Sequence, residues 1–298
     1  MREFIKITIN LFVISVVAAA LLGVVYIFTE RERKSNFIHN LELSMRSYLP
    51  KEVLQEGNYK FNHIYRYLIE EGGSSKIGYL MPDKDGGHLL IIVSAEGELL
   101  ARKGFDAGSE MDDEDARTEA MSVLMGPEVE LTQTNTYIVA SAGGQRLAYY
   151  AEGRTLGFKT WISMMVVLNP DNTIRGLEIL EQEEDPGLGA EISQEYFRNQ
   201  FVNKSLDQLA HLSVVKTPLP DDYKRALEES KWTRRGLSAE EASRIMQQHH
   251  DDQIYSITGS TISSASVTNG VKKIVDAFVK RMAIIDRLIQ ENGLPVDF

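Results

Sequence analysis

The sequence predicts an α+β protein in which a single membrane-spanning helix precedes an antiparallel sheet covered by helices. Three observations carry this prediction. The first is an almost unbroken apolar run close to the N-terminus. The second is a series of segments that alternate apolar and polar residues between glycine-containing turns, a pattern typical of antiparallel strands. The third is a long stretch near the C-terminus with apolar residues three and four positions apart, which predicts an amphipathic helix.

The apolar run from Ile7 to Thr29 predicts a transmembrane anchor with a short N-terminal tail, residues 1–33. Its length is enough to cross a bilayer. A cleaved signal peptide is the alternative, but the run is long for one, and its exit Tyr26–Thr29 has no small-x-small cleavage site. Basic residues flank the run on both sides, so the positive-inside rule does not orient the span.

The composition excludes several classes of function. The formal net charge is −11 and there is no basic stripe, which argues against a nucleic-acid partner. The absence of cysteine excludes cysteine-ligated iron–sulfur clusters in this chain and is compatible with an oxidising compartment. No nicotinamide-binding or hydrolase motif is present, so no catalytic residue is predicted. His249–Asp252 could ligate a metal, but a solvated helix end is the favoured interpretation, so no metal ligand is predicted either.

The segment after the anchor predicts a helix and then an antiparallel unit. Residues 34–56 carry one apolar helical face, and Pro50 ends that pattern. Residues 57–108 alternate, with a hairpin turn at Asp83–Gly87. An acidic run then leads into a short helix that ends at Met125.

The remaining segment predicts four strands, scattered helices and a final long helix. The strands are expected at Tyr137–Ala142, Leu147–Ala151, Trp161–Leu168 and Thr173–Leu180. Residues 205–250 are expected to be helical in pieces, with Ala239–His249 the best candidate. The final helix is expected over 263–291, capped by Ser263 or Ser264 and stopped at Asn292-Gly293.

A run of small residues stands directly before that last helix: Thr258, Gly259, Ser260, Thr261, Ile262, Ser263 and Ser264. Helix N-termini carry unpaired N–H groups and a partial positive charge, which hold phosphate well. No base adjoins these hydroxyls in the sequence, so a self-activated nucleophile is disfavoured. A hydroxyl that carries a phosphate-linked group is the sharper interpretation, and a plain serine-glycine helix cap is the alternative.

A second loop follows the last predicted strand, and its glycines allow a ligand to come close to the backbone. It consists of Glu184, Asp185, Pro186, Gly187, Leu188 and Gly189. Two glycines around one leucine, after a proline, predict a fixed loop that offers a ligand bare backbone and one apolar side chain.

Together the two segments resemble the signatures of a known family, the covalently flavinylated FMN-binding subunits: the G subunit of the Rnf electron transport complex and the C subunit of the Na⁺-translocating NADH:quinone oxidoreductase. That family has a Glu-Thr-Pro-Gly-Leu-Gly loop and a Ser-Gly-Ala-Thr segment whose Thr bears FMN through a phosphoester. Residues 184–189 match the loop with Asp185 in place of Thr, and residues 258–261 match the segment with Thr258 for Ser and Ser260 for Ala. The resemblance departs at Tyr255, which stands six positions before the modified Thr, where the family carries Asp.

The resemblance implies covalent FMN on Thr261 in a domain that covers residues 137–298. Residues 34–136 would then be a membrane-proximal helix and an inserted α/β lobe. Trp161 could lie near the flavin or pack in the core. The residues expected around the cofactor are Thr258, Gly259, Ser260, Thr261, Ser263, Ser264, Glu184, Pro186, Gly187, Leu188 and Gly189.

The resemblance also implies a function, an electron-carrying subunit of an ion-translocating Rnf-type complex with no independent catalytic site. Its partners would be other membrane subunits and an FAD-dependent flavin transferase. The large domain would lie on the periplasmic side of the cytoplasmic membrane. The alternatives are the equivalent subunit of the sodium-pumping complex, a freestanding anchored flavoprotein, and a non-redox binding or sensing domain that has lost flavinylation.

Overall fold

The computed structural model describes residues 2–105, 111, 113–296 and 298, and the chain forms two compact units, Met1–Ser47 and Tyr48–Phe298. The first unit is a single helix, α1 (Arg2–Ser47). Its segment Glu3–Tyr26 is apolar and long enough to cross a membrane, and none of that segment is buried against protein. An exposed apolar helix of this length fits the predicted anchor.

The helix predicted over 34–56 is two helices. Its first part continues α1 without a break to Ser47, and a second helix, α2 (Lys51–Glu56), begins after Pro50. Pro50 occupies the N-cap of α2 with φ −58°, a position where its missing N–H costs nothing.

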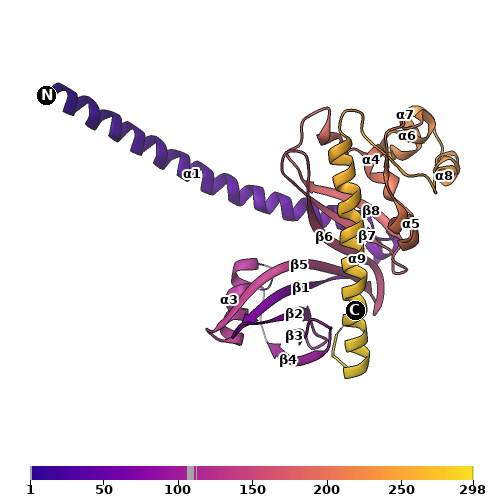
Figure 1. The fold of residues 1–298 in the computed structure, drawn as a ribbon, viewed down its shortest axis with the longest axis horizontal. Helices are drawn as coiled ribbons and strands as arrows, with labels where there is room; N and C mark the ends of the chain where they lie inside the picture. Colours follow the sequence, from indigo (N-terminus) through magenta and orange to yellow (C-terminus); the bar gives the residue numbers. More distant parts are fainter. Residues whose placement is uncertain (1, 106–110, 112, 297) are drawn as a thin grey trace. The chain divides into compact units, whose positions relative to one another are not determined.

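The second unit is built on one eight-stranded sheet (Figure 1). Its strands are antiparallel, as the alternating segments predicted. Its spatial order is β4-β3-β2-β1-β5-β6-β7-β8. The strands are β1 (Lys60–Glu71), β2 (Ser74–Pro82), β3 (His88–Val93), β4 (Leu99–Phe105), β5 (Val129–Ala142), β6 (Gln145–Leu156), β7 (Trp161–Leu168) and β8 (Ile174–Glu181). The sheet is continuous through β5, which crosses the predicted domain boundary at 136/137; that boundary stays a prediction.

The sheet splays in its middle. Strand β5 pairs with β1 over nearly its whole length, from Val129 to Ser141. It pairs with β6 only from Tyr137, opposite Ala151, to the hairpin turn. The second half of β6 instead pairs with β7, up to Leu156 opposite Trp161. The sheet therefore divides into a β1–β5 part and a β6–β8 part joined at the β5–β6 hairpin.

Helices cover each part, and one long helix runs past both (Figure 1). The helix α3 (Glu114–Met125) packs on the β1–β5 part, where Met121 joins a small apolar core. The segment after β8 holds η2 (Gly189–Ser193), α4 (Glu195–Arg198), η3 (Asn199–Phe201), α5 (Leu206–His211), α6 (Asp221–Leu227), η4 (Glu229–Lys231), α7 (Trp232–Arg235) and α8 (Ala239–Gln248). The short parallel pair β9 (Val214–Val215) and β10 (Ile254–Tyr255) precedes the long helix α9 (Thr261–Asn292).

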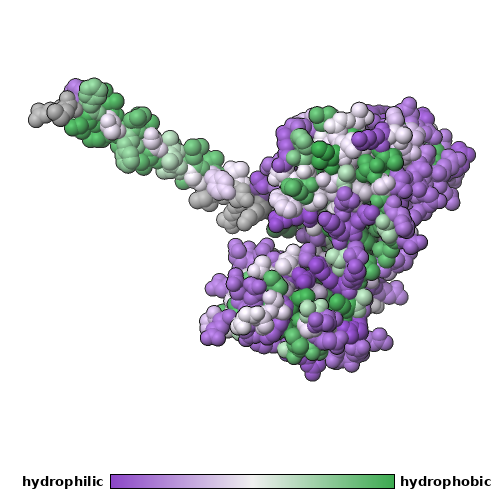
Figure 2. Space-filling model, viewed as in Figure 1, coloured by the Kyte–Doolittle hydropathy of each residue, from purple (hydrophilic) through white to green (hydrophobic). Residues whose placement is uncertain are grey.

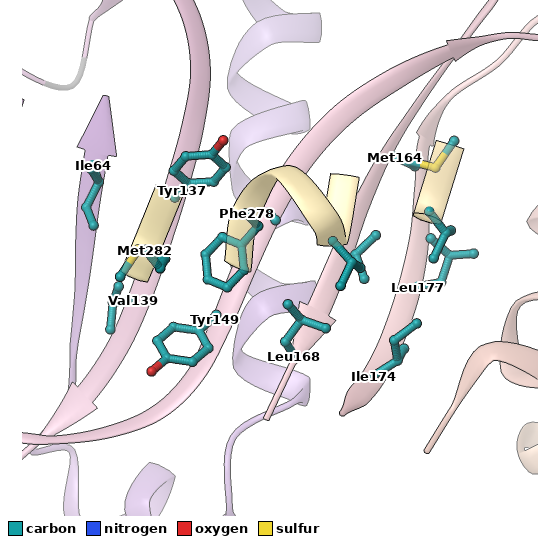
Figure 3. Packing of buried hydrophobic residues seen from close by; sticks show 14 of the residues in the cluster. Ile64, Tyr137, Val139, Tyr149, Met164, Leu168, Ile174, Leu177, Phe278 and Met282 are labelled. Atoms are coloured by element: carbon teal, nitrogen blue, oxygen red, sulfur yellow. The ribbon is translucent and has the colours of Figure 1, made fainter. Parts of the chain in front are cut away.

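The main core lies between α9 and the sheet (Figure 3). The apolar stripe that the sequence predicted on this helix is buried along its length, and it includes Val267, Val271, Val275, Phe278, Met282, Ile285 and Leu288. The Phe278 ring packs against Tyr137 and Tyr149 at centroid distances of 5.4 and 5.3 Å. Because α9 is anchored in both parts of the sheet, its first turn is held in a defined position.

The predicted N-terminal cap of this helix is wrong. The helix begins at Thr261, and its N-cap is Ser260, whose side chain makes no capping hydrogen bond. Ser263 and Ser264 lie inside the first turn and are buried. The predicted stop is confirmed, because Gly293 adopts the left-handed conformation that ends helices, with φ +56°.

Candidate functional site

The structure brings together the two segments that the sequence singled out. A methyl group built on Gly259 would stand 3.0 Å from the Leu188 Cδ2 atom, and one on Gly189 would stand 3.0 Å from the Ser263 Oγ atom. Gly187 and Gly259 have φ angles of +73° and +79°, which side chains rarely tolerate. The loop and the hydroxyl turn thus form one site at the N-terminal end of α9.

A buried carboxylate ties this site together. Glu184 is only 5% exposed, and its Oε2 atom accepts a hydrogen bond of 2.5 Å from the Ser263 hydroxyl. Its Oε1 atom accepts a 3.0 Å bond from the Lys159 backbone N–H, in the turn between β6 and β7. One side chain therefore links the loop, the hairpin and the first turn of α9, and both of its oxygens are engaged by protein groups.

Asp185, which stands where the family carries Thr, also interacts with the hairpin. Asp185 forms an ion pair with the Lys159 ammonium group. This pair raises the pKa of Lys159, chiefly through the hydrogen bond to Asp185. Lys159 thus contacts the loop twice, through its backbone N–H and through its side chain.

Three of the five hydroxyl groups in the turn are buried and hydrogen-bonded within the protein. The Ser260 hydroxyl donates to the Ser263 oxygen at 3.1 Å. The Ser264 hydroxyl donates to the Ser260 carbonyl at 2.9 Å and accepts from the Ile257 N–H at 3.1 Å. All three serines are buried. Burial and these hydrogen bonds make them structural elements of the turn.

The other two hydroxyls face outward. Thr258 is exposed, and Thr261, the first residue of α9, is partly exposed. Three apolar side chains of the loop, the turn and the β6–β7 hairpin are also exposed: Leu188, Ile262 and Phe158, at 45, 56 and 63%. Figure 2 shows apolar residues gathered over the part of the molecule that holds the N-terminal end of α9.

Trp161 belongs to the same surface. Its indole is nearly half exposed, and the Arg154 guanidinium lies 4.7 Å from the ring centroid. Packing in the core, one of the two roles that the sequence left open for this residue, is therefore wrong. An aromatic ring held on the surface by a cation is available to a ligand or a partner.

Tyr255, where the family carries Asp, lies in β10 beside an acid. Its hydroxyl donates to the Asp252 Oδ2 atom at 2.7 Å, and the same oxygen contacts the His249 Nδ1 atom at 2.7 Å. Burial and the Asp252 carboxylate raise the pKa of Tyr255 to about 12. Burial opposes ionisation of Asp252, but the hydrogen bonds from His249 and Tyr255 outweigh it and hold its pKa below the ordinary value.

Sequence reasoning missed the contribution of the hairpin. Lys159 has no motif that marks it, because its role depends on the β6–β7 pairing that places it beside Glu184.

Within the part of the chain that the structure describes, no group of three or more His, Cys, Asp or Glu side chains is arranged to hold a metal ion.

Comparison with known proteins finds a match for the part of the chain that holds this site. Residues 157–276, which include both the loop and the hydroxyl turn, match the FMN-binding domain family. The G subunit of a proton-translocating ferredoxin:NAD⁺ oxidoreductase complex from Clostridium ljungdahlii is 26% identical over 163 residues, or 54% of this chain and 70% of the relative.

Two further proteins are similar. The G subunit of a Na⁺-translocating ferredoxin:NAD⁺ oxidoreductase complex from Acetobacterium woodii is 27% identical over 141 residues, 47% of this chain and 53% of the relative. The chain thus spans about half the length of this second relative. A crystal structure of the C subunit of Na⁺-translocating NADH-quinone reductase from Parabacteroides distasonis aligns over 60% of this chain and 71% of the other, with 22% identity and a TM-score of 0.34.

Proposed function

We propose that this chain, whose residues 157–276 match the FMN-binding domain family, is a membrane-anchored electron carrier that holds FMN covalently on Thr261. We assign it as a subunit of an ion-translocating, Rnf-type electron transport complex. This assignment is supported by relatives that are subunits of ferredoxin:NAD⁺ oxidoreductase complexes. One relative is named for protons and the other for Na⁺, so the ion that this chain would serve is left open.

The observation that carries the proposal is the division of the five hydroxyls. Ser260, Ser263 and Ser264 are buried and hydrogen-bonded to protein, while Thr258 and Thr261 are accessible. Of these two, Thr261 begins α9, so a phosphate on its oxygen would meet the unpaired N–H groups of the first turn. The N-terminus of such a helix carries about half a positive charge. That charge supports a phosphate without a neighbouring lysine or arginine.

The residues around Thr261 fit FMN. The glycine backbone at 187 and 259 allows close approach, and Leu188 and Ile262 offer apolar surface to a flat ring. Bound FMN would supply one- and two-electron redox chemistry. The chain's own part is to hold the phosphate at α9 and to fix the loop against it through Glu184.

Attachment would require a separate FAD-dependent transferase. In that step the Thr261 oxygen bonds to the FMN phosphorus, the pyrophosphate bond of FAD breaks, AMP leaves, and the hydroxyl proton is lost. The transferase must accept Tyr255 where the family has Asp. The Asp252 carboxylate, which accepts a hydrogen bond from the Tyr255 hydroxyl, supplies a negative charge next to that position.

We place the large domain on the periplasmic face of the cytoplasmic membrane, in line with the resemblance. A single apolar helix and relatives from membrane complexes support anchoring. The side is tested by fusing alkaline phosphatase or a fluorescent protein to the C-terminus. Phosphatase activity in the periplasm supports the assignment, and cytoplasmic fluorescence of the second fusion contradicts it.

The attachment itself is tested by co-expression with a flavin transferase. The full chain should give a fluorescent band on a denaturing gel, and proteolysis with mass spectrometry should place FMN on the peptide that contains Thr261. Thr261→Val should remove the fluorescence, while Thr261→Ser, which keeps a hydroxyl, and Thr258→Val should retain it. A dark parent band would overturn the redox function, and a fluorescent Thr261→Val band would overturn the site.

A further inference from the structure

A second site lies where the sheet splays, away from the Thr261 turn. It is a cleft of about 660 Å³ between the first half of β5, the second half of β6 and the flank of α9. None of its lining residues belongs to the 184–189 loop or the 258–264 turn. The residues that matter below are Asn135, Tyr137, Glu152, Arg154, Lys273 and Arg281. The waist between the two parts of the sheet is largely hydrophilic in Figure 2.

Two unpaired strand edges face this cleft. Residues 129–136 of β5 pair with β1 on one side, and on the other side no described strand pairs with them. Residues 152–156 of β6 likewise pair only with β7 among the described strands. Each edge offers a row of backbone N–H and C=O groups, which is a template for another strand. Strand addition of this kind is a common way to recognise an extended peptide.

The cleft has a formal excess of positive charge, in a chain whose net charge is −11. It contains Arg154, Lys273 and Arg281 against two acids, Glu114 and Glu152. None of the three cations forms an ion pair within the described part of the chain: the Arg281 Nη1 atom donates to Asn135 and Tyr137, and Arg154 lies over Trp161. Burial raises the pKa of Glu152. Among the described residues, no ion pair therefore neutralises these three cations.

The spacing of two cations matches an extended chain. Lys273 and Arg281 are eight residues apart on α9 with Ala277 between them, and a rise of 1.5 Å per residue separates them by about 12 Å. In an extended strand, side chains four residues apart lie on one face and are separated by about 13 Å. Two acidic side chains at that interval would reach both cations.

We propose that an extended segment of a partner protein, with acidic side chains four residues apart, adds as a strand to the free edge of β5 in this cleft. The backbone ladder would supply affinity, and the α9 cations would select the acidic segment. The proposal rests on the proposed function only for the source of the partner, another member of the same complex. It does not depend on flavin attachment.

The test compares hydrogen exchange in the isolated full chain and in the complex purified from membranes. Amides over 131–136 should exchange at least tenfold more slowly in the complex. The edge strand β4, over 100–103, is the matched control and should exchange equally in both. Lys273→Glu and the milder Lys273→Gln should reduce this protection, while reversal of the exposed Lys280 on α9, Lys280→Glu, should leave it intact.

Three results would overturn the proposal. Equal exchange over 131–136 in the free and assembled chain would exclude strand addition. Protection that survives Lys273→Glu unchanged would exclude the acidic segment. Inorganic phosphate that protects the same amides as the complex does would make the cleft an anion site. Flavin fluorescence, read on the same samples, reports separately on the Thr261 site.

Discussion

Gly189→Ala tests whether the loop and the first turn of α9 are packed as tightly as the site requires. A methyl group at Gly189 would stand 2.6 Å from the Glu184 Oε2 atom, 2.7 Å from the Glu184 Cβ atom and 3.0 Å from the Ser263 oxygen. Contacts under 3.0 Å are essentially never seen for real Cβ atoms. The Glu184 carboxylate is buried and bonded at both oxygens, so it has no free direction in which to move.

The expected loss of stability follows from three contributions. Overpacking a close-packed site costs about 1–3 kcal/mol. Breaking the hydrogen bond between Ser263 and the Glu184 carboxylate costs about 1.5–3 kcal/mol. Replacing glycine at an ordinary φ angle returns about 0.4–1 kcal/mol through the unfolded chain. The net loss is about 2–5 kcal/mol, and each kcal/mol lowers the melting temperature of a domain this size by about 2–4 °C.

The assay is thermal unfolding of the full chain in detergent, followed by tryptophan fluorescence, with flavin incorporation measured on the same variants. Gly104→Ala is the control, because nothing lies within 4 Å of its added methyl group and its φ angle is ordinary. Gly189→Ala should melt well below the parent and incorporate less flavin, while Gly104→Ala should match the parent in both. If Gly189→Ala melts within a degree of the parent and is fully flavinylated, the packing argument fails.

Two further predictions concern charged groups of the folded domain. Asp286→Asn removes the ion pair in which Arg146 donates two hydrogen bonds to this carboxylate, at 2.9 and 2.6 Å. Since Asp286 is 44% exposed, the free energy of unfolding in urea should fall by only about 0.5–1 kcal/mol. The difference should shrink in high salt. Asp252 has a lowered pKa, so its stabilisation is fully present above its unfolded value of 3.8 and is lost as pH falls through the folded value. The urea midpoints of the parent and Asp252→Asn should therefore differ at neutral pH and converge in strong acid, and a constant difference down to the lowest pH would contradict the assignment.

The strands and the two motif segments could be predicted because their signals are local. Alternation over Thr173–Leu180 predicted a strand and periodicity along α9 predicted an amphipathic helix, and the structure confirms both, as β8 and α9. The contact between the two segments could not be predicted from either one. It depends on the Ser263–Glu184 hydrogen bond, which joins residues 79 positions apart.

The start of α9 shows where local reasoning fails. A serine in the first turn of a helix has the same local sequence whether it caps that helix or is buried in it. Ser263 and Ser264 are buried because the loop and Ile257 supply their partners, and the helix consequently starts at Thr261. The cleft was missed for a related reason, since it depends on where the β5–β6 pairing stops, at Tyr137 opposite Ala151.

The position of Glu184 explains how the site can be both rigid and open. An isolated carboxylate is costly to bury, but this one accepts two hydrogen bonds and lies at the positive end of a 32-residue helix. The interior bonds of the turn are therefore complete without Thr261, whose side chain is left partly exposed at the same helix end. A group attached to Thr261 would add its contacts without breaking any of those that hold the loop and the helix together. That separation between the hydroxyls that build the turn and the hydroxyl that would hold the cofactor is the physical basis for choosing Thr261 among the five.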